Sequence, residues 1–172
     1  ALTALQSQHT AQGNWDSYAT LLERRLEGAR TRKQRVELLL ELGDVAHNRL
    51  HDVDRALALY RQVCEISPFN STARSRLRNI FIEARDWDNL RGLYEPRGDW
   101  SGYLCLLRDH LQRADPSDRY HLLVEVASAE TELLQNIDGA RMALVSALEA
   151  APEQVEVAQR LLEEHGERLG DE

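Results

Sequence analysis

The sequence of this chain returns to itself after 84 or 85 residues, and this internal repeat constrains the fold more than any other feature. The segment 52–68 matches the segment 137–152 at a shift of 84, and the identical pairs are Ala56 and Ala140, Glu65 and Glu149, and Pro68 and Pro152. The segment that begins at Trp15 returns at a shift of 85, where the identical pairs are Trp15 and Trp100, Tyr18 and Tyr103, Leu21 and Leu106, Leu22 and Leu107, and Leu26 and Leu111. Self-similarity at a fixed spacing is typical of repeat architectures. We therefore expect two copies of one unit, residues 1–85 and residues 86–170, that together form one continuous domain.

The repeated segment 52–68 has the pattern of an amphipathic helix. Its apolar residues recur at steps of three and four, as in a helix buried on one side, and they are Ala56, Leu59, Tyr60, Val63 and Ile66. Asp52 predicts the start of this helix, because its carboxylate can accept the free amide hydrogens of the first turn. Pro68 predicts its end, because a proline pushes the residue before it out of helical geometry.

Similar patterns along the chain predict five helices in each copy. In the first copy they fall near residues 1–10, 15–28, 31–50, 52–68 and 70–84. In the second copy they fall near residues 87–93 and 100–111, and then begin at residues 115, 137 and 152. Further caps are expected at Asn70 or Ser71 and at Asp115. The composition agrees, since Leu, Ala, Glu and Arg dominate and β-branched residues are scarce. Each helix has about one apolar stripe to bury against its sequence neighbours. We therefore predict an all-α fold, an antiparallel helix-hairpin solenoid of about ten helices in two five-helix copies.

The segment 42–68 also resembles a known family. Ala56, an aromatic residue four positions later at Tyr60, and a closing Pro68 resemble the second helix of a tetratricopeptide repeat, and Leu42-Gly43 resembles its first helix. More weakly, the spacing of Trp15 and Tyr18 is similar to the half-a-tetratricopeptide repeats of RNA-processing factors. The resemblance implies a superhelix whose first helices line a concave groove, in which a partner lies as an extended or helical peptide.

The groove residues follow from this resemblance alone. They are Glu37, Asp44, His47 and Asn48 from one pair, Thr72, Ser75, Asn79 and Glu83 from the next, and His121, Ser128 and Glu132 from the copy. The lysine and asparagine with which chaperone-binding members clamp a terminal carboxylate are absent, because Leu40 and Asp44 stand at those positions. We therefore expect a mixed polar groove for a protein or peptide without such a clamp.

Charge and composition limit the partners and the compartment. The formal net charge of −8 argues against a nucleic-acid partner, which needs a basic face. The sequence contains no apolar run of about 18 residues, so we predict no membrane span. Cys64 and Cys105 fall on apolar helix faces, so we expect buried thiols, a reducing compartment and a cytoplasmic location. Lys33 is the only lysine beside many arginines, which suggests a GC-rich bacterial genome. The start at Ala1 suggests a fragment of a longer repeat protein, so any N-terminal targeting segment could lie in the part that is not present.

Two patterns could carry chemistry. One is the group of Asp44, His47, His51, Asp52 and Asp54, in which the two histidines lie four residues apart and could hold a metal from one helix face. Asn48 stands where a zinc protease has its catalytic glutamate, which argues against that chemistry. The carboxylate pairs Glu163 and Glu164, and Asp115 and Asp118, fit solvated faces or helix starts better than acid–base catalysis. We therefore predict no enzyme, no metal and no cofactor.

A basic cluster, made of Arg74, Arg76, Arg78 and Arg85, could bind an acidic peptide or a phosphate. We expect these arginines instead to pair with acidic residues of neighbouring helices.

Three hypotheses follow, in order of preference. The first is a non-catalytic scaffold that presents its groove to a protein or peptide. The second is self-assembly through the solenoid ends into a homo-oligomer. The third is a metal-dependent activity at His47 and His51.

Overall fold

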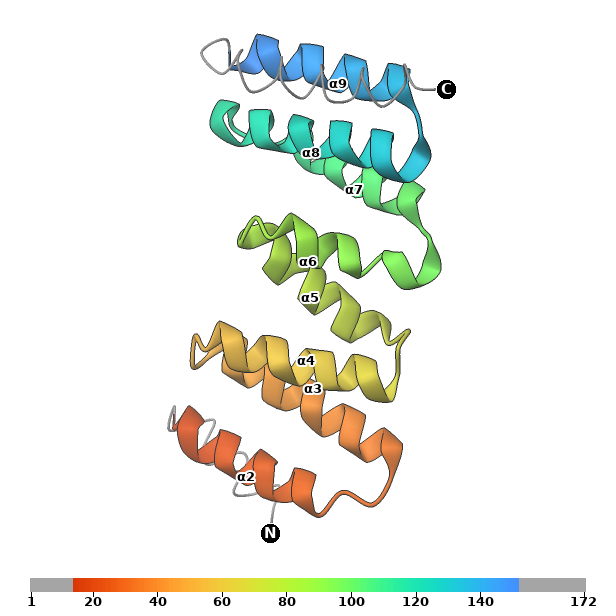
Figure 1. The fold of residues 1–172 in the computed structure, drawn as a ribbon. Coiled ribbons are helices and arrows are strands. Elements are labelled where there is room, and N and C mark those ends of the chain that lie inside the picture. Colours follow the sequence, from red (N-terminus) through yellow and green to blue (C-terminus); the bar gives the residue numbers. More distant parts are fainter. Residues whose placement is uncertain (1–13, 152–172) are drawn as a thin grey trace. The chain divides into compact units, whose positions relative to one another are not determined.

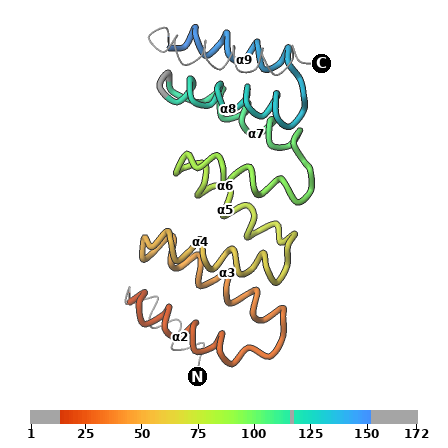
Figure 2. Tube along the Cα trace, in the orientation of Figure 1, coloured from red at the N-terminus to blue at the C-terminus, as the bar shows by residue number. Residues whose placement is uncertain are grey.

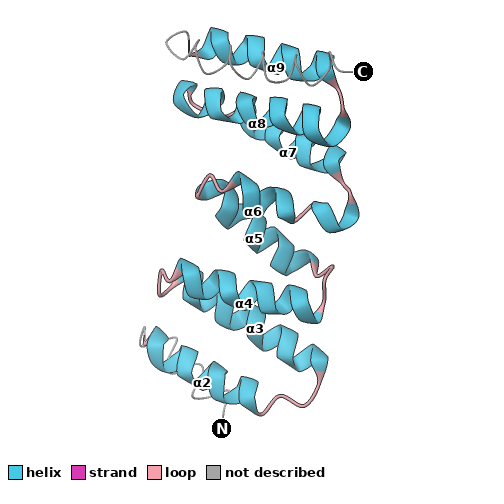
Figure 3. Cartoon of the chain, viewed as in Figure 1, coloured by secondary structure: helices cyan, strands magenta, loops and turns pink. Residues whose placement is uncertain are grey.

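A computed structural model of the chain describes residues 14–151, and over this range the fold is all helical (Figures 1 and 3). The helices are α2 (Trp15–Glu27), α3 (Arg32–Asn48), α4 (Val53–Ile66), α5 (Ser71–Glu83), α6 (Trp87–Gly92), α7 (Trp100–Leu111), α8 (Pro116–Leu134) and α9 (Ile137–Ala150), with a short 3-10 helix, η1 (Glu95–Arg97). The all-α prediction is confirmed. The helices expected near residues 1–10 and 152–166 lie outside the described residues.

The chain divides into two compact units, Ala1–Leu90 and Arg91–Glu172, and the boundary falls within α6. In the first unit, α3 packs against both α2 and α4, and α4 packs against α5. The core between these helices consists of side chains with almost no exposed area: Leu22, Leu39, Leu42, Ala46, Ala56, Tyr60, Val63, Ala73 and Leu77. These residues include most of the apolar stripe that the repeated segment predicts.

In the second unit, α8 packs against α7 and, over a longer contact, against α9. Its core includes Tyr103, Leu107, Ala127, Ala129, Leu144 and Ala147, all almost fully buried. A cluster at one end of α8 gathers Tyr120 and Leu123 with Ala147 and Ala151 of α9 and its C-cap. Both units thus contain a helix hairpin, α3/α4 in the first and α8/α9 in the second.

The two hairpin turns, which join α3 to α4 and α8 to α9 along the trace in Figure 2, share a left-handed residue and a hydrogen bond. After α3 the left-handed residue is His51, with a φ of 55°, and after α8 it is Gln135, with a φ of 53°. In each turn the next residue donates its amide to a carbonyl of the preceding helix, Asp52 to Ala46 at 2.9 Å and Asn136 to Glu130 at 2.8 Å. These pairs correspond under the 84-residue shift of the sequence.

The helix starts follow from capping side chains. Asp52, Asn70 and Asp115 each accept a backbone amide three residues later, at 2.8 to 3.0 Å, as the sequence predicts. Asn14 and Asp99 cap α2 and α7 in the same way. Because these caps satisfy amides that the helix cannot bond internally, they fix where each helix begins.

One prediction about the cysteines is wrong. Cys105 is exposed, because it lies two positions from both Tyr103 and Leu107 and therefore on the far side of α7 from the core. Cys64 is half-buried, and burial raises the pKa of its thiol. No helix among the described residues combines the length and the apolar character that crossing a bilayer requires.

Candidate functional site

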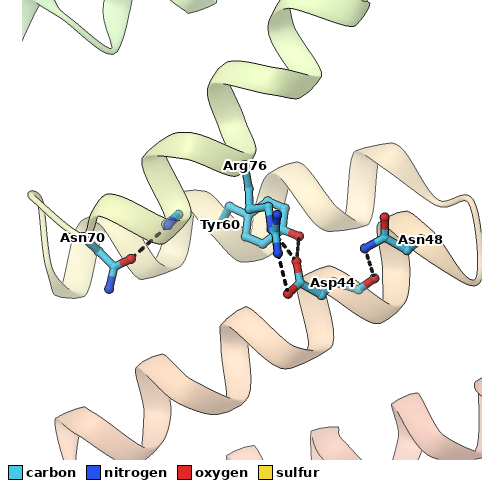
Figure 4. Close-up of polar contacts among 6 residues, drawn as sticks. Asp44, Asn48, Tyr60, Asn70 and Arg76 are labelled. Carbon is cyan, nitrogen blue, oxygen red and sulfur yellow. Dashed lines mark hydrogen bonds and ion pairs between the residues drawn. The ribbon is translucent and has the colours of Figure 1, made fainter. Parts of the chain in front are cut away.

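The most developed polar arrangement among the predicted groove residues is centred on Asp44 of α3 (Figure 4). Its Oδ1 accepts a hydrogen bond from the hydroxyl of Tyr60 on α4 at 2.7 Å. Arg76 of α5 donates from Nε to Oδ1 at 2.8 Å and from Nη2 to Oδ2 at 3.3 Å. One carboxylate therefore connects three successive helices, and both of its oxygens are occupied.

The site depends on a close approach between α3 and α4. Gly43 precedes Asp44, and a Cβ placed on Gly43 would lie 2.6 Å from Cε1 of Tyr60. The ring of Tyr60 is fully buried, so it has no room to move away. Glycine at position 43 thus lets the aromatic ring lie against the backbone of α3 and brings its hydroxyl to Asp44.

The electrostatics of this cluster keep Tyr60 neutral. Burial raises the pKa of the Tyr60 phenol far above its usual value, and the hydrogen bond to Asp44 and the charge of that carboxylate raise it further. The hydrogen bonding of Arg76 to Asp44 raises the pKa of the Arg76 guanidinium. The phenol of Tyr60 therefore stays protonated near neutral pH and acts in the cluster as a hydrogen-bond donor.

The other predicted groove residues of the first unit lie mostly at the surface. Asn48 is exposed and donates from Nδ2 to the backbone oxygen of Asp44 at 2.9 Å, and His47 is half-buried. Glu37 is exposed and lies 3.9 Å from Lys33, one turn away on the same helix. On α5, Ser75 accepts a hydrogen bond from Arg78 at 3.2 Å. The other predicted groove residues of this helix, Thr72, Asn79 and Glu83, are exposed.

In the second unit the three predicted residues have different surroundings. Glu132 pairs with Arg91, with 3.0 Å between Oε2 and Nη1. His121 is exposed and packs edge-on against Tyr120, and Ser128 is half-buried. The described part of the second unit has no cluster equivalent to that of Asp44, because the positions that correspond to Asp44 and Tyr60 hold Ser128 and Leu144.

A different ionic cluster stabilises the second hairpin. Glu130 has 1% of its area exposed, and its carboxylate accepts from Arg108 of α7 and, at 2.8 Å, from Nδ2 of Asn136. Asn136 also caps α9 by accepting from Gly139 N at 3.2 Å. The fully buried charge is thus satisfied from two sides and connects α7, α8 and the turn before α9.

The candidate metal and carboxylate sites do not assemble within the described part of the chain. Over residues 14–151 no three side chains among His, Cys, Asp and Glu come together as metal ligands, so His47 and His51 have no third ligand there. Asp115 is the cap of α8, which accounts for it as a helix-start charge. Glu163 and Glu164 lie outside the described residues.

Sequence reasoning missed the partners of Asp44. The arginine cluster is expected to pair with acidic residues, and Arg76 does so. Its partner is Asp44, which the sequence instead assigns to the groove. The available indication was the combination of Gly43 and the large aromatic Tyr60 on consecutive expected helices, because a glycine facing an aromatic ring favours close packing of two helices.

No family model matches this chain, and comparison with curated proteins and with solved structures likewise gave no match.

Proposed function

We propose that this chain is a non-catalytic, tetratricopeptide-like scaffold that binds a peptide or protein through polar residues of α3 and α5. The observation that carries this proposal is the Asp44 cluster, which fixes α3, α4 and α5 to one another through a single carboxylate. A surface held by such contacts is pre-organised, so binding would cost conformational freedom only in the partner.

Residues that remain free for a partner also support the proposal. Thr72, Asn79 and Glu83 are all exposed, and their spacing of seven and four residues places them on one face of α5. A polar face of this kind, adjacent to the rigid cluster, suits recognition of a peptide by hydrogen bonds. In the proposed solenoid this face would belong to the groove.

Capture of partners from a lysate of the source cell tests the proposal. The groove variant carries Thr72→Arg, Asn79→Arg and Glu83→Arg and leaves the Asp44 cluster intact. A matched control carries Ala58→Arg, Ser146→Arg and Glu149→Arg, which are exposed positions on α4 and α9 and change the charge equally. We expect a partner that is retained by the native chain and the control and is lost by the groove variant. A partner retained equally by all three proteins would place binding elsewhere.

Self-assembly is the second candidate, and exposed apolar residues on α9 favour it. Met142 is 68% exposed and Val145 is 46% exposed, and they lie three residues apart on one face. Burial of such residues between two copies would contribute favourable free energy. A mass in sedimentation equilibrium that rises with concentration, and that Met142→Glu returns to the monomer, would support this candidate. A constant monomer mass would rule it out.

A further inference from the structure

The N-terminal end of α3 and the C-terminal end of α4 lie on the same side of the first unit (Figure 1). Residues at these two ends line a basic cleft. Its volume is about 430 Å³. Three arginines line one part of it, namely Arg30, Arg32 and Arg35, and Gln62, Glu65 and Ile66 of α4 line another. None of these residues belongs to the predicted groove, so the cleft is a separate feature.

Unlike Arg55 and Arg76 of the same unit, the three arginines have no acidic partner among the described residues. Arg55 pairs with Glu23 at 2.6 Å, and Arg76 pairs with Asp44 at 2.8 Å. Within residues 14–151, neither an ion pair nor a side-chain hydrogen bond involves any of the three cleft arginines. In a chain with 29 acidic residues against 21 basic ones, three exposed guanidinium groups on one cleft make a local excess of positive charge.

The end of α3 does not itself provide the binding groups. Thr31 caps this helix, since its Oγ1 accepts from Gln34 N at 3.2 Å, and its backbone oxygen accepts from Arg35 N at 3.0 Å. The binding chemistry of the cleft therefore comes from the guanidinium groups, whose forked donors match the two oxygens of a carboxylate.

Size and lining indicate the class of ligand. A volume of about 430 Å³ is that of a pocket for several connected groups and exceeds what one small anion needs. The lining also includes the apolar side chains of Ala29 and Ile66, and the acceptors of Gln62 and Glu65. The carboxylate of Glu65 can accept from the main-chain amides of a peptide, which supply N–H donors that a phosphate lacks.

We propose that this cleft binds an acidic peptide segment of a partner protein. The guanidinium groups of Arg30, Arg32 and Arg35 donate to its carboxylates, Glu65 accepts from its backbone amides, and Ile66 packs against an apolar side chain. This inference goes beyond the proposed groove and shares no residue with it, so either can fail without the other.

Fluorescence anisotropy of the full chain with a fluorescein-labelled peptide, in which glutamates flank one central leucine, tests the proposal. The cleft variant carries Arg30→Gln, Arg32→Gln and Arg35→Gln. The control carries Arg113→Gln, Arg119→Gln and Arg141→Gln, which are exposed arginines of the second unit and lower the net charge equally. We expect saturable binding that the cleft variant weakens about tenfold or more, because hydrogen bonds between charged groups are lost, and that the control leaves nearly unchanged.

Several results would overturn the proposal. The first is that the native chain shows no saturable binding, the second is that both variants weaken binding equally, and the third is that a glutamine version of the peptide binds equally well. Tighter binding of inorganic phosphate or of a phosphoserine peptide than of the glutamate peptide would assign the cleft to phosphate instead. If circular dichroism shows that the triple variant does not fold, Arg32→Gln and Arg35→Gln are tested singly, and unchanged affinity in both would overturn the proposal. The groove variant of α5 is expected to bind this peptide normally, which separates the two proposals.

Discussion

The hairpins α3/α4 and α8/α9 share a backbone design but place their polar contacts differently. Both turn through a left-handed residue, and in both a tyrosine of the preceding helix donates to a glutamate, Tyr18 to Glu41 and Tyr103 to Glu125. In the first hairpin the ionic cluster is centred on Asp44, in the last part of α3, and reaches forward to α5. In the second it is centred on Glu130, likewise in the last part of α8, and reaches back to α7.

The difference shows how a repeat can change its chemistry without changing its packing. Where the first hairpin places Gly43 against Tyr60, the second has Ala127 and Leu144 at the corresponding positions, and all four are buried. A smaller residue on one helix thus accompanies a larger one on the other, which keeps the combined volume nearly constant. The loss of the tyrosine hydroxyl removes the reason for an acid at position 128, where the chain has Ser128.

The largest expected effect comes from breaking the cluster of the second hairpin. Arg108→Ala would leave the carboxylate of Glu130 buried without its cationic partner and is expected to cost about 3 kcal/mol of unfolding free energy. Urea denaturation followed by tryptophan fluorescence measures this cost.

A double variant sharpens this test. Adding Glu130→Ala removes the buried charge. It also gives position 130 an alanine, as at the corresponding Ala46 of the first hairpin. The double variant should therefore be more stable than Arg108→Ala alone. Equal or lower stability would show that the buried charge is not the source of the cost.

A smaller effect is expected from exchanging packing pairs between the hairpins. Gly43→Ala places a methyl group against the ring of Tyr60 and should cost about 2 kcal/mol by overpacking. In the background of Tyr60→Leu, which reproduces the pair of the second hairpin, the same substitution should cost much less. Denaturant titration of the four proteins gives the coupling, and a coupling near zero would contradict the volume exchange.

The hydroxyl of Tyr60 provides a third comparison, which depends on pH. Tyr60→Phe removes the bond to Asp44 and should cost about 1.5 kcal/mol near neutral pH. Tyr94→Phe, at a half-buried ring beside Tyr103, is a suitable control and should cost little.

The sign of the pH dependence follows from the raised pKa of the Tyr60 phenol. The unfolded chain loses this proton near pH 10, its ordinary pKa, whereas the folded chain retains it to higher pH. The stability that the phenol contributes is complete below about pH 10 and is lost as pH rises above that value. The advantage of the native chain over Tyr60→Phe should therefore be constant up to about pH 10 and shrink as the pH rises from about 10 to 11, and a constant difference across that range would contradict this.

The smallest expected effect concerns the turns. His51→Gly relieves a left-handed side chain and should add about 0.5 kcal/mol of stability, and Gln135→Gly should do the same in the second hairpin. His47→Gly, inside α3, should instead destabilise by about 1 kcal/mol. Thermal unfolding distinguishes the two directions. Loss of stability in both turn variants would mean that the side chains matter more than the backbone.

Much of the fold could be predicted because it depends on local rules. Apolar spacing placed α4 and α7, and capping chemistry placed the starts at Asp52, Asn70 and Asp115. The exposure of Cys105 was missed, because an apolar run does not by itself say which of its residues faces the core.

The candidate site was less predictable, since it depends on contacts between distant residues. Asp44 and Arg76 are 32 residues apart, and their meeting is set by the packing of α3 on α4 and of α4 on α5. The buried position of Glu130 was also unforeseen, because the corresponding residue of the first hairpin is Ala46. A repeat in the sequence predicts shared packing, but it cannot predict where a charge moves between copies.

The Asp44 carboxylate has a consequence for how the first unit opens. In a chain of helices that touch only their neighbours, a terminal helix can detach by itself. Asp44 bonds to both the next helix and the one after it, so release of α5 removes Arg76 from a carboxylate that also orients Tyr60. Native-state hydrogen exchange should therefore show the amides of α3, α4 and α5 exchanging through one common opening, as a single cooperative foldon.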